Sequence, residues 1–563
     1  MNSRSPAPST YFGNRRILIV FSLIIFGIGF LTHCGPTSES TTNKKVDSDI
    51  LISDIQSPSD TLFITDTAWK VPHDVSSTKP SQAVLARFAW KEFIALNWPS
   101  SYKVDGKRGN PNTSKTALDF VQVGQDPNLP LVWQTYMHRV ELFPDDTANF
   151  SMSFDVPPHY VYKDPIPNID NPGVFLTSQD TIFSNLDETS EINLCTVFTT
   201  GDATAPGATT NPPTSSFLPG APRRVIYEAK ANRVFYQYIK DKVLYDTITK
   251  KALSDYTNRR ISNATSVDTL GGIYPCPSND SLICFPHGVA DVGGSEGSIE
   301  VKASWRQLSE AEYNSGRFLT APILYYRQGT LSNLGDSKVY YQVISGKVTA
   351  SERPFGLVGL HIIHKTKNVP TYVFATFEQV DNLVYTMPQN DLFLYNRNWN
   401  VVVDKSKISI RNRIHGISST TMAVNSQVQR QVRDLDTTSV WQYYQLIGTQ
   451  GPANGNQDTT NFLLANIVTE TNEVLSNFVG TLDAVNGTIL NSNGVNVHKG
   501  RKSFVQGGCK GCHGNSQKTD FSFITANGPF KGEPDVVNQP LLIQKPPQTG
   551  GPLQPATGTV PGF

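Results

Sequence analysis

The first strongly periodic segment of the chain spans residues 81–98 and reads SQAVLARFAWKEFIALNW. Leu85, Phe88 and Phe93 fall on one helical face, and the two tryptophans of the segment widen that face. Ser81 is a suitable N-cap, because its hydroxyl can accept a hydrogen bond from a backbone N–H of the first turn. So wide an apolar surface predicts a buried helix.

Helical spacing returns at three later places in the chain. A helix is predicted after Pro222, where apolar residues recur at intervals of three and four. These residues are Tyr227, Ala231, Val234 and Tyr238. Residues 420–435 and 462–478 also have helical character. Residues 201–219 are dominated by Thr, Pro, Ala and Gly and therefore predict a loop.

From about residue 297 the pattern becomes that of β-strands. Five segments alternate or run apolar, are rich in β-branched and aromatic residues, and are separated by Gly, Pro, Ser and Asn. They read SIEVKASW, FLTAPILYYR, VYYQVIS, FGLVGLHIIH and TYVFATFEQV. Strands in succession predict an antiparallel sheet. With 41 glycines and 37 prolines in the chain, the predicted fold class is α+β: a large, loop-rich domain with an antiparallel β-sheet and several buried helices.

The N-terminus has the pattern of an export signal. Arg15 and Arg16 precede an apolar run over residues 17–31, which is short for a membrane span and typical of a signal peptide. The run ends in LTHCG, which resembles the lipobox of bacterial lipoproteins, whose Cys becomes the lipidated N-terminus. The resemblance implies lipidation at Cys34, although His33 departs from the small residue usual before the Cys. A signal anchor, or ordinary cleavage nearby, is the alternative.

The segment after Cys34 is polar and rich in Ser, Thr and Asp, so residues 35–75 are predicted to be a flexible tether. Gly35 is not the aspartate that retains lipoproteins in the inner membrane. We therefore expect a lipid-anchored, extracytoplasmic protein at the outer membrane, on its periplasmic face or the cell surface. Lys+Arg and Asp+Glu both number 48, so no charge excess indicates a nucleic-acid partner.

One motif carries recognisable chemistry, the C-x-x-C-H of Cys509, Cys512 and His513. This is the signature of covalent haem attachment, in which two thiols bond to the haem and the adjacent imidazole binds its iron. A thioredoxin-like redox pair would need a βαβ context, which the pattern does not show. Half of a zinc site would need a second Cys or His pair nearby, and none follows.

The segment GRKSFVQGGCKGCHG resembles the N-terminal helix and haem-binding turn of a class I cytochrome c. The resemblance implies one covalent haem c with His513 as the proximal ligand. Phe504 lies one position farther from the first Cys than the family pattern has its aromatic residue. The residues after His513 contain neither Met nor His, so the usual Met ligand is absent. We therefore expect the haem segment, residues 491–563, to dock on the large domain, residues 76–490, that follows the signal (1–34) and the tether.

A sixth ligand, if present, must come from upstream of the motif. His361 and His364 lie in the predicted strand GLVGLHIIHKT and point to opposite faces. His364 continues the apolar face and is the candidate distal ligand, while a five-coordinate iron is equally compatible with the sequence. Cys276 and Cys284 are close in sequence and, in an oxidising compartment, are candidates for a disulfide.

Three function classes are compatible with these features. The first is a haem-dependent oxidoreductase of unknown substrate, favoured because the domain outside the haem segment is far larger than a simple carrier needs. The second is an electron-transfer cytochrome that exchanges electrons with a redox partner protein or a small molecule. The third is a binding or scaffold lipoprotein that contains haem. No Ser/His/Asp, zinc-protease or dinucleotide motif indicates another chemistry.

Overall fold

The computed structural model of the chain describes residues 62–126, 129–162, 182–188, 194–199, 222–261, 281–289, 294–308, 310–328, 338–343, 355–383, 392–396, 417–451, 509 and 513–530. All of them belong to one unit, which begins at Ile52. Several predicted features lie outside the described residues. These are the signal peptide with Cys34, the loop 201–219, the helix 462–478, Cys276 and Cys512.

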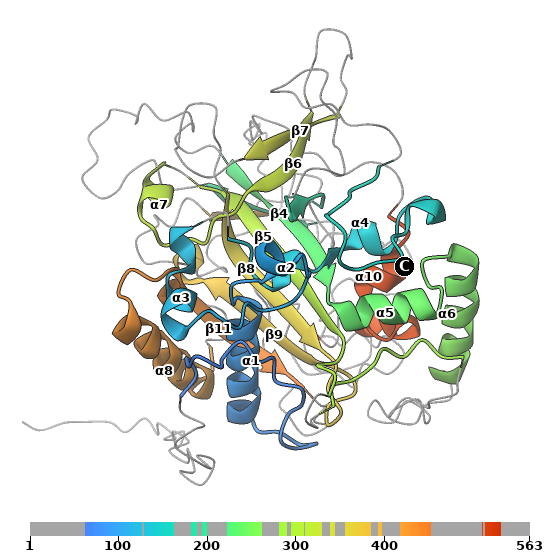
Figure 1. Cartoon of the computed structure of the whole chain (residues 1–563), viewed down its shortest axis with the longest axis horizontal. Coiled ribbons are helices and arrows are strands. Elements are labelled where there is room, and N and C mark those ends of the chain that lie inside the picture. Colours follow the sequence, from blue (N-terminus) through green and yellow to red (C-terminus); the bar gives the residue numbers. More distant parts are fainter. Residues whose placement is uncertain are drawn as a thin grey trace, which may run out of the picture. The chain divides into compact units, whose positions relative to one another are not determined.

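An eight-stranded antiparallel sheet forms the centre of this unit (Figure 1). Its strands are β1 (Met137–His138), β3 (Leu194–Thr199), β4 (Pro222–Ala231), β5 (Ile299–Gln307), β8 (Phe355–His364), β9 (Val373–Gln379), β10 (Leu392–Asn396) and β11 (Tyr444–Gln450). They are ordered β10-β3-β4-β5-β8-β9-β11, with β1 paired to β4. A smaller sheet has the order β2-β6-β7. Its strands are Ser184–Leu186, Ile323–Gln328 and Lys338–Val343, respectively.

The described helices are mostly short. They are α1 (Gln82–Leu96), α2 (Tyr102–Asp105), α3 (Ala117–Val121), α4 (Arg139–Leu142), α5 (Arg233–Asp241), α6 (Thr247–Ile261), α7 (Glu310–Asn314), α8 (Ser419–Leu435) and α10 (Phe523–Asn527). Short 3-10 turns are η3 (Val123–Gln125), η4 (Trp133–Thr135), η5 (Thr147–Asn149), η7 (Val380–Leu383), η8 (Val440–Tyr443) and η11 (Gly514–Thr519). Helices and an antiparallel sheet together confirm the α+β class.

Helix α1 forms where the sequence predicts it. The Ser81 hydroxyl accepts a hydrogen bond from the backbone N–H of Val84 at 3.3 Å and so caps the first turn. Its wide apolar face packs on the sheet, where Phe93 contacts the rings of Phe377 and Trp441. Helix α8 confirms the prediction for residues 420–435 and packs beside α1. The five predicted strand segments contain β5, β6, β7, β8 and β9.

The prediction of a helix directly after Pro222 is wrong for the first half of the segment. Residues 222–231 form β4, and the helix α5 begins only at Arg233. Residues four apart, such as Tyr227 and Ala231, lie on one side of a strand as well as of a helix, so their spacing did not distinguish the two. Asn232 sets the boundary between strand and helix, because its side-chain oxygen caps the helix by accepting a hydrogen bond from the backbone N–H of Phe235 at 3.1 Å.

The start of the described chain lies on the core. Phe63 and Ile64 are buried and belong to the cluster of apolar side chains under α1. Their backbone N–H groups donate to the side-chain oxygen of Gln431 in α8, at 2.8 and 3.2 Å. Residues 62–75, the last part of the predicted tether, are therefore packed on the folded unit. No helix within the described residues is long and apolar enough to cross a membrane.

The two faces of the central sheet carry different side chains. Along β8, Leu360 and Ile362 join the large apolar cluster that also includes α1 and α8. His361 and Ile363, between and after them, face the opposite side, because successive residues of a strand alternate. This second face is where the C-terminal segment of the described chain docks.

Candidate functional site

Residues 513–530 pack on the second face of the sheet and on α6. Figure 1 shows α10 grouped with α5 and α6. Phe521 lies in an apolar cluster with Ile363 and Phe374 of the sheet, and Cys509 belongs to the same cluster with an exposed fraction of 2%. The described part of the C-x-x-C-H motif thus lies against strands β8 and β9.

His513 is held in one orientation by a backbone carbonyl. Its Nδ1 lies 2.7 Å from the carbonyl oxygen of Phe521. A carbonyl can only accept, so Nδ1 carries the proton, and Nε2 is the nitrogen with a lone pair for a metal. A histidine whose other ring nitrogen donates to a carbonyl is the usual arrangement of metal-binding imidazoles. The rings of Phe374 and Phe523 pack around His513, with centroids 5.1 and 4.7 Å from it.

A second imidazole faces His513 from the sheet. His361 is 6% exposed, and its cross-strand neighbours are Lys302 on β5 and Thr376 on β9. The ring centroids of His361 and His513 are 5.8 Å apart, and their planes are inclined by 28°. A metal bonds an imidazole nitrogen at about 2 Å, so two imidazoles on one metal have ring centres roughly 6 Å apart. By centroid separation, the two rings are spaced as two imidazoles on one metal ion would be.

Both histidines line a cavity of about 40 Å³ that is partly open to solvent. Its other lining residues are Arg139, Ala229, Glu300, Val301, Lys302, Ile363, Phe523, Ile524, Asn527 and Phe530. Most of the wall is aliphatic or aromatic, which suits a flat macrocycle. Its charged part consists of Arg139, Lys302 and Glu300. The donor set and the lining are of the chemical kind that binds haem.

Arg139 keeps its positive charge at this cavity. Burial would lower its pKa, but the carboxylates of Asp187 and Glu188, each 3.1 Å from the guanidinium, raise the pKa above its ordinary value. The guanidinium also lies over the ring of Phe530, 4.4 Å from its centroid. Arg139 is thus held at the cavity wall by two carboxylates and an aromatic ring, and the carboxylates already balance its charge.

His364, the distal candidate from the sequence, lies on the other face of β8. Its Nδ1 is 2.8 Å from Oε1 of Glu92 in α1, and its Nε2 is 2.5 Å from the backbone carbonyl oxygen of Glu296. Burial lowers the pKa of His364, but Glu92 and Glu296 together raise it above its ordinary value. Both ring nitrogens are engaged here, so the structure brings His361 to His513 and leaves His364 in the α1 interface.

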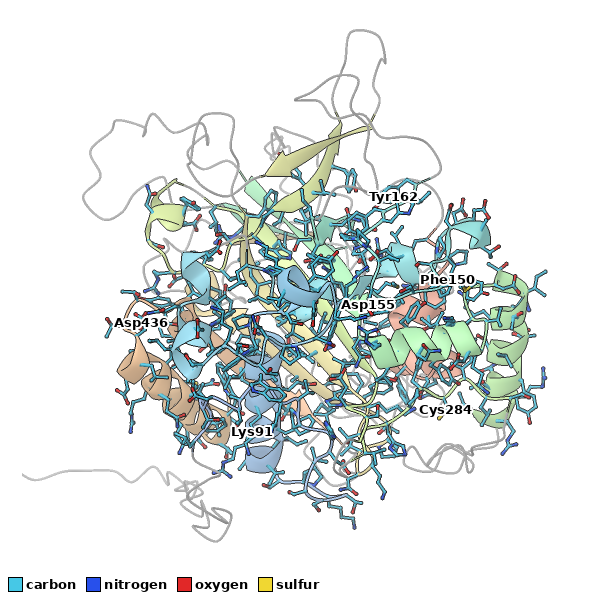
Figure 2. The ribbon with its side chains drawn as sticks, viewed as in Figure 1. Lys91, Phe150, Asp155, Tyr162, Cys284 and Asp436 are labelled. Atoms are coloured by element: carbon cyan, nitrogen blue, oxygen red, sulfur yellow. The ribbon has the colours of Figure 1, made fainter. Side chains whose placement is uncertain are left out.

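Cys284 is part of a disulfide whose partner lies beyond the described side chains. The predicted pairing with Cys276 therefore stays a prediction. Figure 2 shows Cys284 near helix α5, and its backbone N–H donates to the hydroxyl of Tyr238 at 2.8 Å. The cysteine shares an apolar cluster with Cys509, so a disulfide lies close to the C-x-x-C-H motif.

No protein-family model, curated protein or solved structure matches the chain. Within the described residues, no three His, Cys, Asp or Glu side chains gather as a metal site would require. A haem iron needs only two axial protein ligands, so this result leaves the fit of His361 and His513 unaffected.

The placement of His361 beside His513 was missed from sequence because the apolar alternation of the strand favoured His364. A side chain that continues an apolar face lies in the core, where a buried partner such as Glu92 binds it in place of a metal. The opposite face of the same strands holds Glu300, Lys302 and His361, a run of polar residues in a sheet otherwise buried on both sides. That run of polar residues is the sequence signal that indicates a polar site at His361.

Proposed function

We propose that this chain is a lipid-anchored, extracytoplasmic c-type cytochrome that transfers electrons through one covalent haem c. Cys509 and Cys512 would attach the group, and His513 and His361 would ligate its iron. The observation that carries the proposal is the pair of imidazoles, 5.8 Å apart, of which one belongs to the C-x-x-C-H motif. When bound, the haem supplies a one-electron redox centre.

The protein residues around this centre have distinct tasks. The carbonyl of Phe521 orients His513 and increases the basicity of its ring, which stabilises the oxidised iron. Phe523, Ile524 and Phe530 exclude water from one side of the cavity. Two histidine ligands would leave no open iron position for a substrate, which favours electron transfer with a redox partner protein or a small molecule over catalysis.

A haem-dependent oxidoreductase is the second candidate. It is supported by Glu300 and Lys302, which line the same cavity as His361. If His361 did not bind the iron, it would stand beside an open coordination position as an acid or base. The two candidates differ in one property, because only an open iron binds carbon monoxide readily.

Covalent attachment is tested by removing both thiols. Cys509→Ala with Cys512→Ala should abolish haem-stained protein on a denaturing gel, because no thioether bond can then form. Cys195→Ala, outside the motif on β3, is the matched control and should keep the stain. Wild-type protein without any stain, when expressed with haem-maturation machinery, would refute the proposal.

Anchoring is tested separately at Cys34. The lipobox-like sequence predicts that mature protein starts at a lipidated Cys34, and that Cys34→Ala releases the protein or blocks its processing. Mass spectrometry of the membrane fraction measures this modification directly. Wild-type protein recovered without lipid from the periplasm would contradict the anchor, and His33 would then be the residue to replace.

A further inference from the structure

We infer that the buried pair Lys365–Asp520 positions His513 for its ligand role, an inference that rests on the proposed haem site. Asp520 and Lys365 are both fully buried, and the Lys365 ammonium donates to Oδ2 of Asp520. The same oxygen accepts from the backbone N–H of Phe285 at 2.6 Å. Asp520 is therefore tied to two segments of the large domain at once.

The pair holds an unfavourable turn. Asp520 and Phe521 both have positive φ, 55° and 64°, a left-handed conformation that disfavours residues with a side chain. Asp tolerates it better than Phe does. Two backbone hydrogen bonds close the turn: the N–H of Asp520 donates to the carbonyl of Gln517, and the N–H of Phe521 donates to the carbonyl of Ser516. A strained conformation of this kind persists only where surrounding contacts determine it.

This turn aims the carbonyl of Phe521 at His513. The conformation of Phe521 fixes where its carbonyl points, and that carbonyl accepts from Nδ1 of His513 at 2.7 Å. If the turn relaxed, the imidazole would lose the bond that sets its tautomer and ring orientation. Neither Lys365 nor Asp520 lines the cavity, and the turn is the connection through which they act on His513.

Strand β8 supplies both sides of the arrangement. Lys365 directly follows the strand, and its backbone is fixed by hydrogen bonds to Ser298 and from Gly288, both 2.9 Å. His361 lies four positions earlier on the same strand. Strand β8 and the residue after it thus carry both the His361 imidazole and the Lys365 ammonium. That ammonium anchors the turn behind His513. The separation of the two imidazoles is set by a single strand.

The test replaces the pair without leaving a lone buried charge. Lys365→Met with Asp520→Ala removes the ion pair, the anchor to Phe285 and the side chain that tolerates positive φ. In full-length holoprotein we expect the haem reduction potential to rise, because a weaker Nδ1–H···O bond makes His513 less basic. Lys365→Met with Asp520→Asn keeps the acceptor for Phe285 and should shift the potential less. If the first variant does not fold, the second carries the test.

Two comparisons separate positioning from stability and from the haem itself. Glu312→Gln removes a partner of the buried Arg306 at the other end of β5, and should lower stability without moving the potential. In full-length Cys509→Ala/Cys512→Ala protein, nitrogen NMR of His513 should report the Nδ1–H tautomer, and the paired variants should reduce its population. An unchanged potential and an unchanged tautomer would overturn the inference. Wild-type protein without haem would instead refute the proposed function, while the tautomer measurement would still decide on the turn.

Discussion

The two faces of the central sheet differ in what covers them and in how their side chains are used. One face packs on α1 and α8, helices with apolar stripes, and its side chains are mostly aliphatic and aromatic. The other face bears Glu300, Lys302 and His361 and receives a segment that lies more than 150 residues later in the chain than His361. The first face carries the large apolar cluster, and the second carries a smaller apolar cluster together with directed polar contacts.

The difference indicates that the α1 face determines mainly the stability of the fold, and the opposite face the chemistry of the site. Removing apolar area from the α1 face costs free energy of unfolding but leaves His361 and His513 in place. Removing a polar group from the other face changes the chemistry of the site while little apolar area is lost. Substitutions on the two faces should therefore change different observables.

The largest expected loss of stability follows from Phe93→Ala on the α1 face. Phe93 is fully buried and packs against Trp90, Phe377 and Trp441. A cavity of this kind costs about 3–5 kcal/mol. Denaturant unfolding of the holoprotein measures the loss, and the haem absorption spectrum of the folded variant should be unchanged. A spectral change of the size seen for ligand loss would show that the two faces are not independent.

A smaller loss, dependent on pH, is expected for Glu92→Gln. Because Glu92 helps to raise the folded-state pKa of His364 above its ordinary value of about 6.5, the ion pair stabilises the fold fully below that value. The contribution is lost as pH rises through the folded-state pKa. We expect Glu92→Gln to cost about 1–3 kcal/mol at pH 6 and less at higher pH. A loss that did not depend on pH would show that His364 does not change its protonation state over the range measured.

The smallest change in stability, with the largest change in spectrum, is expected for His361→Ala. Its imidazole packs beside Phe374 and His513 and contributes little apolar area, so the free energy of unfolding should change by about 1 kcal/mol or less. Loss of a ligand should convert low-spin ferric haem to high-spin and allow carbon monoxide to bind the ferrous form. His364→Ala is the matched control, and should lower stability while the haem stays low-spin.

Much of the α1 face was predictable from sequence, and much of the other face was not. Residues 81–98 have helical periodicity and an N-cap at Ser81, and residues 420–435 have helical character, so both helices were predicted. The boundary between strand β4 and helix α5 at Asn232 was not predicted. A spacing of four residues is compatible with both a strand and a helix, and only the N-cap distinguishes them. The meeting of His361 with His513 depends on a contact between distant segments, which no local pattern encodes. The turn at Asp520 depends on Lys365 in the same way.

Electron paramagnetic resonance of the ferric full-length protein, purified with its haem attached, tests the central claim most directly. Two imidazole ligands from His361 and His513 predict a low-spin signal typical of bis-histidine haem, with no sulfur-to-iron band at the far-red end of the absorption spectrum. A high-spin signal in the wild type would contradict ligation by His361 and favour the open-site oxidoreductase. A clear methionine-type band would contradict both candidates, because it would require a ligand from elsewhere in the chain.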